Sequence, residues 1–395
     1  MKKLTILFLL VVSISASAQN WETVIENKTF DSGLLTENKS NVLIKDCFVS
    51  NRNGVYGIKL INCQNVRINN TKVHSVGNEE SNSLNNLKGS KEYVFAFGNA
   101  IGIYLVDCNK VIVEKSEVLD VFGQGIKIFG AHNIKTSNII LDGNRIAYIY
   151  DDAVKFEVKG DQNDNSPDSA NNPFKGGIIR NNIIHDIGLG VVRLPFARHG
   201  MYLKAADILV EGNTIYNCFY GSGISLRNAG IIRNNKIWNC AYACIAYHAQ
   251  TKTSESSKTV IIENNDCRQE YAMDFPMRHI SNPSKSFNPC VLGCIMLGID
   301  GKMPESPLFI EKFIVLNNKC SIYKDFPSEL DKRTMVNDNP VNSGKRQIAM
   351  ITINGKIDAT KLSITGNTLI DDRVRKIYFN DFKTIATDTI GNIRK

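Results

Sequence analysis

Titratable and polar side chains recur in three short segments of the chain. Residues 151–157, 198–204 and 221–227 read DDAVKFE, RHGMYLK and GSGISLR. Apolar residues alternate with polar ones in each segment, which is the period of a β-strand. The polar set contains carboxylates, amines, a histidine and a tyrosine. Proteins use these groups for general acid–base catalysis and for binding anions.

Matching positions in these segments are expected to become neighbours in space. The segments align on their central apolar residues, Val154, Met201 and Ile224. Strands of successive repeats stack about 4.8 Å apart, which brings aligned side chains within reach of one another. Residues one and three places after the reference point outward by alternation. Residues two places before it would point inward in a straight strand, but the glycine that follows most of them predicts a bend that brings them to the rim.

The alignment therefore predicts one cluster of chemically active side chains on an outer face. The repeats on either side carry far fewer charges at the same positions, so the concentration favours a functional site over an ordinary solvated face. The cluster comprises Asp151, Asp152, Lys155, Glu157, Arg198, His199, Tyr202, Lys204, Arg227 and His248, with Lys127 one repeat earlier.

The first chemistry that fits this cluster is β-elimination on a uronate. That reaction needs a base for the proton beside the carboxylate, an acid for the leaving oxygen, and cations that neutralise the carboxylate. We expect Lys155 or His199 to be the base and Tyr202 the acid, with Lys204 and Arg227 on the carboxylate. Cations around Lys155 would lower its pKa toward neutrality.

The remaining polar residues suit binding. Positive or neutral donors are expected to hold an anionic substrate, and these are Lys127, Arg198 and His248, beside Lys204 and Arg227. Oxygen ligands suit Ca²⁺, and a Ca²⁺ site is predicted from Asp151, Asp152 and Glu157. No other cofactor is expected.

A second kind of strand repeats between the segments and predicts the architecture. Its copies end in Asn or Gly-Asn, at residues 66–70, 178–182, 208–213, 231–235 and 260–265. Asn and Gly tolerate left-handed backbone at a sharp bend, and a column of Asn side chains could hydrogen-bond from coil to coil. The tightest spacing, from Asn213 to Asn235, is too short for a strand–helix–strand crossover but suits one turn of a right-handed parallel β-helix. An antiparallel sandwich would not place Asn at the same point of every repeat.

The termini and composition set the class of protein. Lys2 and Lys3 precede an apolar run, and Ala16-Ser17-Ala18 offers a cleavage site, so residues 1–18 are expected to be a secretory signal peptide. Residues 19–395 are then one exported, monomeric domain, periplasmic or secreted, with no later membrane span. The chain carries a formal charge of +8, which suits an acidic polymer as partner. Without a dense Lys/Arg tract interleaved with aromatics, nucleic acid is not expected.

Two further features of the sequence complete the expected architecture. The 10 cysteines mostly occupy matching positions in different repeats, which predicts buried, stacked thiols, although disulfides between neighbours such as Cys218 and Cys240 are an alternative. Polar insertions are concentrated at residues 79–92, 159–175, 268–289 and 323–345. We expect them to project from the turns and to wall a groove.

The signal peptide, the Asn-ended strands and the Gly-Ile-x-Leu strands over residues 40–370 resemble the pectin-lyase-like right-handed β-helix superfamily. That resemblance implies an all-β right-handed parallel β-helix. Its members include polysaccharide lyases, glycoside hydrolases, epimerases and phage or surface proteins, so the fold does not decide the reaction.

Residues 151–154 and 198–201 also resemble the Asp-Asp and Gly-His-Gly motifs of the polygalacturonase family. This local resemblance implies an inverting glycoside hydrolase with Asp151 as the acid, Asp152 as a base and His199 in support. The family's further catalytic Asp would fall at Gln124, and its Arg-x-Lys motif is not matched near Arg227. Elimination on an acidic polysaccharide therefore ranks first and hydrolysis second. A non-catalytic glycan-binding or envelope protein is the third interpretation.

Overall fold

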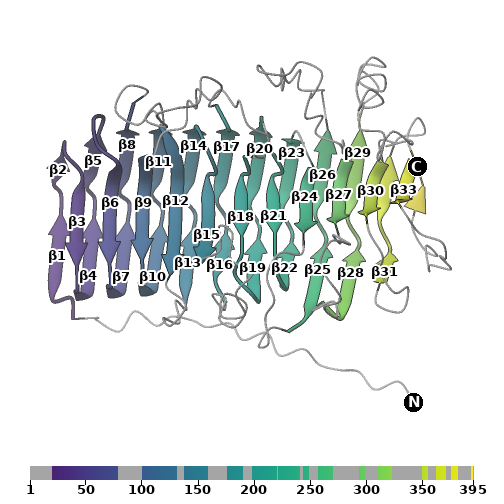
Figure 1. The fold of residues 1–395 in the computed structure, drawn as a ribbon, viewed down its shortest axis with the longest axis horizontal. Helices are drawn as coiled ribbons and strands as arrows, with labels where there is room; N and C mark the ends of the chain where they lie inside the picture. Colours follow the sequence, from purple (N-terminus) through teal and green to yellow (C-terminus); the bar gives the residue numbers. More distant parts are fainter. Residues whose placement is uncertain are drawn as a thin grey trace, which may run out of the picture.

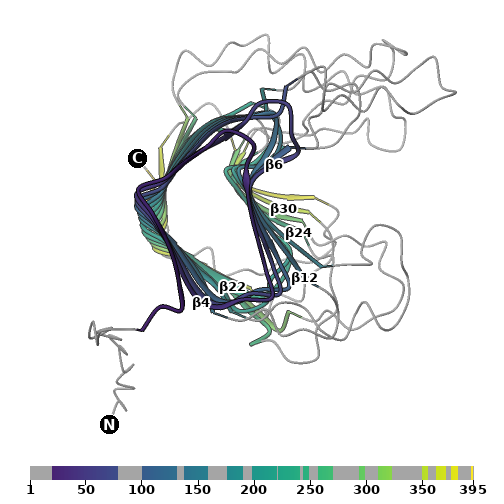
Figure 2. The ribbon, with the colours of Figure 1, turned by 90° about the vertical axis from the view of Figure 1, so that its left-hand side faces the viewer.

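The chain winds through three parallel β-sheets in turn, and each circuit lies on the previous one (Figure 1). Viewed along the long axis, the three sheets surround a common interior (Figure 2). The computed structural model describes residues 20–78, 100–130, 138–158, 176–189, 198–219, 221–240, 243–248, 257–269, 293–298, 310–322, 349–354, 362–370, 375–380 and 393–394. Every regular element within these ranges is a strand.

The first sheet has 11 strands, and neighbouring strands in the sheet come from successive circuits of the chain. Its strands are β1 (Thr23–Glu26), β4 (Ser40–Lys45), β7 (Gln64–Asn69), β10 (Asn109–Glu114), β13 (Ile139–Asp142), β16 (Ile178–Arg180), β19 (Ile208–Glu211), β22 (Gly230–Arg233), β25 (Thr259–Glu263), β28 (Lys312–Leu316) and β31 (Leu362–Thr365).

The second sheet has 12 strands in the same order of circuits. They are β2 (Thr29–Phe30), β5 (Phe48–Asn51), β8 (Lys72–Val76), β11 (Glu117–Val121), β14 (Arg145–Ile149), β17 (Ile183–Ile187), β20 (Thr214–Cys218), β23 (Lys236–Cys240), β26 (Asp266–Gln269), β29 (Lys319–Ile322), β32 (Thr368–Ile370) and β34 (Ile393–Arg394).

The third sheet has 11 strands and carries the predicted cluster. They are β3 (Leu34–Glu37), β6 (Tyr56–Ile61), β9 (Ala100–Val106), β12 (Gly123–Gly130), β15 (Val154–Val158), β18 (Met201–Leu203), β21 (Ile224–Leu226), β24 (Ala243–His248), β27 (Gly293–Gly298), β30 (Ala349–Asn354) and β33 (Arg375–Asn380). All pairings are parallel, so the predicted all-β solenoid is confirmed and the antiparallel sandwich is excluded.

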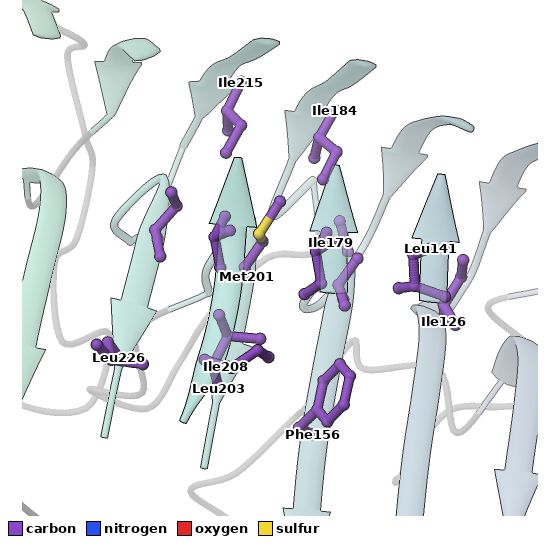
Figure 3. Close-up of a cluster of buried hydrophobic side chains, with 14 of the residues drawn as sticks. Ile126, Leu141, Phe156, Ile179, Ile184, Met201, Leu203, Ile208, Ile215 and Leu226 are labelled. Carbon is purple, nitrogen blue, oxygen red and sulfur yellow. The ribbon is translucent and has the colours of Figure 1, made fainter. Parts of the chain in front are cut away.

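A single apolar core fills the interior of the coil. In the close-up of Figure 3, side chains such as Ile126, Phe156, Met201 and Ile215 extend from different strands into the same space. The inward positions of β12, β15, β18 and β21 are fully buried. Each circuit packs its apolar side chains across the common interior and against the circuits above and below it, so neighbouring coils stabilise one another.

The predicted asparagine column is present at the turn between the first and second sheets. The backbone N–H and side-chain amide of each Asn donate to the side-chain oxygen of the next, as Asn213 does to Asn235 and Asn235 does to Asn265 at 2.9 to 3.0 Å. The residue before each Asn has positive φ, for example Asn234 at 57°. That left-handed residue makes the bend and turns the following Asn into the core. The column runs through Asn144, Asn182, Asn213, Asn235, Asn265, Asn318 and Asn367.

The prediction of buried thiols is confirmed for the described part of the chain. Nine cysteines there are buried and form no disulfide, including the in-register neighbours Cys218 and Cys240. The Sγ atoms of Cys63 and Cys108 lie 3.5 Å from carbonyl oxygens of the preceding coil. These thiols act as small core residues with weak hydrogen bonds.

Several predictions fall on other parts of the chain. The signal peptide at residues 1–18 lies outside the described residues, as do most of the insertions that were expected to wall a groove. In the ranges that are described, no helix has the length and apolar character of a membrane span.

Candidate active site

The predicted cluster forms on the outer face of the third sheet, over β12, β15, β18, β21 and β24. Lys127 pairs in register with Lys155, Lys155 with Tyr202, and Tyr202 with Ser225. These are the alignments that the sequence repeats predict. The structure thus brings together residues that are far apart in the chain, from Lys127 to His248.

Asp152 and His199 also lie on this outer face. The residue after His199 is Gly200, and a Cβ added there would lie 3.0 Å from Ile215 Cγ2 of the second sheet, so this position faces the interior. The side chain before it must therefore point away from the interior. The ring of His199 stacks on that of Tyr202, with centroids 5.5 Å apart. The predicted bend at Gly200 explains why the side chain of His199 points outward and not into the core.

Asp151 is held as an ion pair. One carboxylate oxygen accepts a hydrogen bond from Arg198 Nη1 at 2.6 Å, and the other accepts one from Gln124 Nε2 at 3.1 Å. Burial alone would raise the pKa of Asp151, but the charges of Arg198 and Lys155 outweigh burial and lower it. Asp151 is therefore ionised at neutral pH. It cannot be the proton donor that the polygalacturonase-like motif implied.

Asp152 has the opposite protonation behaviour. Only 3% of the residue is exposed, and its carboxylate accepts one hydrogen bond, from the backbone N–H of His199 at 2.7 Å. Burial and the neighbouring negative charge of Asp151 raise the pKa of Asp152 to about 7. Two adjacent carboxyl groups whose pKa values are pushed apart are a mark of acid–base catalysis.

Lys155 does not have the lowered pKa that the sequence predicted. Its Nζ lies 3.8 Å from Asp152 Oδ2 and 3.6 Å from Glu157 Oε1. Burial acts to lower the pKa of Lys155, but Asp152, Asp151 and Glu157 together raise it. The groups around this amine are mainly carboxylates, so Lys155 is protonated at neutral pH and is not a base.

Glu157 is an ionised carboxylate between two amines. Its Oε2 lies 2.8 Å from Lys127 Nζ. Burial would raise the pKa of Glu157, but Lys155 and Lys127 lower it. The predicted Ca²⁺ site from Asp151, Asp152 and Glu157 is therefore wrong for this geometry, because the Lys155 ammonium lies between two of the three carboxylates. Among the described residues, no group of three or more His, Cys, Asp or Glu side chains is arranged to hold a metal ion.

His199 is a neutral donor and not the base that the sequence suggested. Its Nδ1 lies 3.0 Å from the backbone N of Ser222, whose N–H can only donate. Nδ1 is therefore unprotonated, and the neutral ring carries its proton on Nε2. Burial and the charge of Arg227 hold the pKa of His199 well below its usual range. No side-chain pattern in the sequence signals this contact, because the donor is a backbone group.

We expect NMR to show this tautomer directly. In ¹⁵N-histidine-labelled protein, His199 should remain neutral with its proton on Nε2 well below the ordinary histidine pKa of 6.5, because protonation would break the contact with Ser222. His199→Asn identifies the signal among the 6 histidines. A protonated His199 ring at about pH 6.5, or a proton on Nδ1, would contradict the assignment.

Tyr202 lies at the centre of the cationic side of the site. Lys155 Nζ and Lys204 Nζ are 5.5 and 5.6 Å from its ring centroid, and Arg227 Cζ is 4.8 Å away. These distances are within the range of cation–π attraction. Three cations thus surround one aromatic ring beside His199, where an anionic group could be bound.

The next coils add neutral donors to the cationic side. Burial and the charge of Arg227 lower the pKa of His248 to about 3, so this residue is neutral. The hydroxyls of Ser222 and Ser225 are buried without a hydrogen-bond partner among the described residues. The sequence repeats align these two serines with His199 and Tyr202, but only the structure shows them unpartnered. Buried hydroxyls of this kind can bond to a ligand.

Solved structures with a similar coil include two tailspike proteins and a variant of DFA-IIIase. Dettilon tailspike protein is 14% identical, over 90% of this chain and 61% of its own, with a TM-score of 0.41. A variant of DFA-IIIase from Arthrobacter chlorophenolicus A6, in complex with DFA-III, is 10% identical over 93% and 76%, with a TM-score of 0.45. The tailspike protein of E. coli bacteriophage HK620 is 11% identical over 94% and 53%, with a TM-score of 0.40. Such a likeness concerns the fold alone.

No curated protein matches the sequence. The family model described as "Right handed beta helix region" matches residues 12–178 and 157–273, which together are more than half of the chain. The matched residues include β1 to β26 and, beside β15, β18 and β21, the residues Asp151, His199 and Arg227. Parallel coils, the asparagine column and this match agree, and the chain belongs to the right-handed β-helix family.

Proposed function

We propose that the protein cleaves glycosidic bonds in an acidic carbohydrate, with Asp152 as the group that transfers the proton. The observation that carries the proposal is the buried Asp151–Asp152 pair. Arg198 keeps Asp151 ionised, and Asp151 together with burial keeps Asp152 close to half-protonated at neutral pH. A group with a pKa near the working pH is the most effective general acid or base.

Hydrolysis is the reaction that the carboxylates support best. Protonated Asp152 donates its proton to the glycosidic oxygen, and ionised Glu157 accepts a proton from the attacking water. Asp152 Oδ2 and Glu157 Oε1 lie 3.8 and 3.6 Å from Lys155 Nζ. The two oxygens are therefore no farther apart than the sum of these distances, about 7.4 Å, which is compatible with glycoside hydrolases. Lys155 orients both carboxylates.

The charge of the site favours an acidic substrate. Five cationic side chains, Lys127, Lys155, Arg198, Lys204 and Arg227, surround three carboxylates, Asp151, Asp152 and Glu157. The histidines are neutral, so the face carries an excess of positive charge that grows when Asp152 is protonated. A sugar carboxylate or another anionic substituent would reduce this excess.

Elimination is the second candidate, and the cations around Tyr202 favour it. In this reaction ionised Asp152 removes the proton beside a uronate carboxylate. Lys204 and Arg227 neutralise that carboxylate, and Tyr202 donates a proton to the leaving oxygen. The base is Asp152, since Lys155 is protonated and the free lone pair of His199 already accepts from a backbone N–H.

One assay separates the two reactions. Purified protein is incubated with polygalacturonate, alginate and hyaluronate, and both new reducing ends and absorbance at about 235 nm are followed. Hydrolysis gives reducing ends alone, whereas elimination also gives unsaturated ends that absorb. Binding of a polymer without formation of either product would indicate a non-catalytic glycan-binding protein. The ion pairs Asp151–Arg198 and Glu157–Lys127 would then stabilise the folded structure of this face.

The pH dependence gives an independent answer. Hydrolysis needs Asp152 protonated, so kcat should fall as pH rises through about 7. Elimination needs Asp152 ionised, so kcat should rise through the same range. A rate that does not change between about pH 6 and 8 would remove Asp152 from both mechanisms.

A further inference from the structure

The outer face of the third sheet continues beyond the candidate active site toward the N-terminus. Lys59 of β6 pairs in register with Tyr104 of β9, and Tyr104 pairs with Lys127 of β12. One column of outward positions therefore reads Lys59, Tyr104, Lys127, Lys155 and Tyr202 over five successive coils. Cations and aromatic rings share the whole column, and its first two members belong to none of the roles assigned above.

Lys59 and Tyr104 are held against each other and remain partly exposed. Lys59 Nζ lies 5.6 Å from the ring centroid of Tyr104 and also 5.6 Å from that of Tyr56. Lys127 Nζ lies 5.8 Å from the Tyr104 ring and 5.3 Å from the Phe129 ring. The rings fix the two ammonium groups on the surface. In the described part of the chain no carboxylate lies within ion-pair distance of Lys59, so its charge is available for a ligand.

Toward the C-terminus, the same column of outward positions on the third sheet contains neither a cation nor an aromatic ring in the two coils after Ser225. Past Ser225 the same column continues with Ala246 and Met296. These two residues and Ala243 are buried and form an apolar cluster separate from the main core. On the C-terminal side the cationic and aromatic surface thus ends at the coil of Arg227, whereas on the N-terminal side it continues over β12, β9 and β6, which gives the site a direction.

We propose that Lys59 and Tyr104 form a distal subsite that binds a second acidic sugar unit of the same chain that reacts at Asp152. This inference rests on the proposed function. The ammonium of Lys59 would bind the anionic group, and the Tyr104 ring would contact the sugar ring. Three coil spacings separate β6 from β15, or about 14 Å. One sugar unit cannot span that distance, so the substrate is a chain of several acidic units lying along the helix axis.

Length-dependent binding tests the subsite without turnover. The inactive Asp152→Asn variant is titrated with polygalacturonate, alginate and hyaluronate and with digalacturonate, by calorimetry. Tyr104→Ala and Lys59→Ala in the same background should each weaken binding of a bound polymer about three- to tenfold and leave digalacturonate binding unchanged. Matched controls are Tyr216→Ala and Lys236→Ala on the second sheet, which should change neither.

The outcomes separate this subsite from the proposed reaction. If Tyr104→Ala and Tyr216→Ala weaken polymer binding equally, or if digalacturonate binding falls as much as polymer binding, the subsite is wrong. Binding of none of the three polymers also overturns it. If the length dependence is found but wild-type protein forms no product from any polymer, the subsite stands and the catalytic proposal fails.

Discussion

Replacing Asp152 with asparagine is expected to abolish glycosidic cleavage and to stabilise the folded protein at neutral pH. Asparagine has the same shape, and its Oδ1 still accepts the hydrogen bond from the backbone N–H of His199. It cannot donate or accept a proton, so kcat should fall about 10²- to 10⁴-fold. Product formation from the best polymer measures the loss.

The gain in stability follows from the raised pKa. Asp152 ionises at its ordinary pKa, 3.8, in the unfolded chain, but at about 7 in the folded protein. Between these values the folded state binds more protons, so wild-type stability falls as pH rises from about 4 to about 7. The uncharged amide of the variant escapes that loss, and we expect Asp152→Asn to be about 2 to 4 kcal/mol more stable at pH 8 and little different at pH 4.

The control for this substitution is an aspartate on the surface. Asp120 is exposed and its carboxylate accepts a hydrogen bond from the Ser75 hydroxyl. Asp120→Asn should leave activity unchanged and stability at each pH within a few tenths of a kcal/mol of wild type. Urea denaturation at about pH 4 and 8 measures both variants. Activity in the Asp152→Asn protein would show that this carboxyl does not transfer the proton. Unchanged stability of the variant at the higher pH would show that burial and Asp151 do not raise the pKa of Asp152.

Asn235→Ala is expected to cause a large loss of stability. The residue is 1% exposed. Its N–H and side-chain amide donate to Asn265 and to the carbonyls of Val210 and Arg233, and its Oδ1 accepts two hydrogen bonds from Asn213. Alanine leaves several of these buried groups without partners, at about 1 to 3 kcal/mol each. We expect a loss of about 3 to 5 kcal/mol in the free energy of unfolding.

A substitution at the neighbouring residue, Asn234, distinguishes the contribution of the asparagine column to stability from that of the bend. Asn234 is exposed and left-handed, with φ of 57°. Asn234→Gly keeps that backbone conformation and should cost less than about 1 kcal/mol. Thermal unfolding of both variants tests the difference. Equal losses for the two variants would mean that the buried asparagines stabilise the bend alone and do not link one coil to the next.

The sequence predicted the fold and which side chains become neighbours, because both follow from a one-dimensional repeat. Asn213 and Asn235 mark the same point of two coils, and this fixes the length of a coil. Val154 and Met201 then fix the register of the third sheet, and Lys155 must lie beside Tyr202. Such a prediction needs only the identity of the residue at the same register position in the adjacent coil. The glycine after His199 even indicated the bend that puts this side chain outside.

Protonation states could not be predicted in the same way. The pKa of Lys155 depends on diagonal distances to Asp152 and Glu157 within its own strand and turn, which outweigh the cations of adjacent coils. The role of His199 depends on one backbone N–H from Ser222. Aligned columns show which side chains are adjacent, but not which atoms meet. The lowered pKa predicted for Lys155 was wrong for this reason, and the carboxylates proposed as Ca²⁺ ligands lie against lysine amines instead.

Because each coil touches only the coils on either side, the proposed subsite at Lys59 and Tyr104 and the proposed chemistry at Asp152 would be encoded by different stretches of the gene. Duplication of the circuit that contains β9 would add another aromatic ring, that of Tyr104, to the proposed binding face. The acid–base pair would keep the same two neighbouring coils. Specificity for longer chains could thus be acquired or lost without rebuilding the reaction centre.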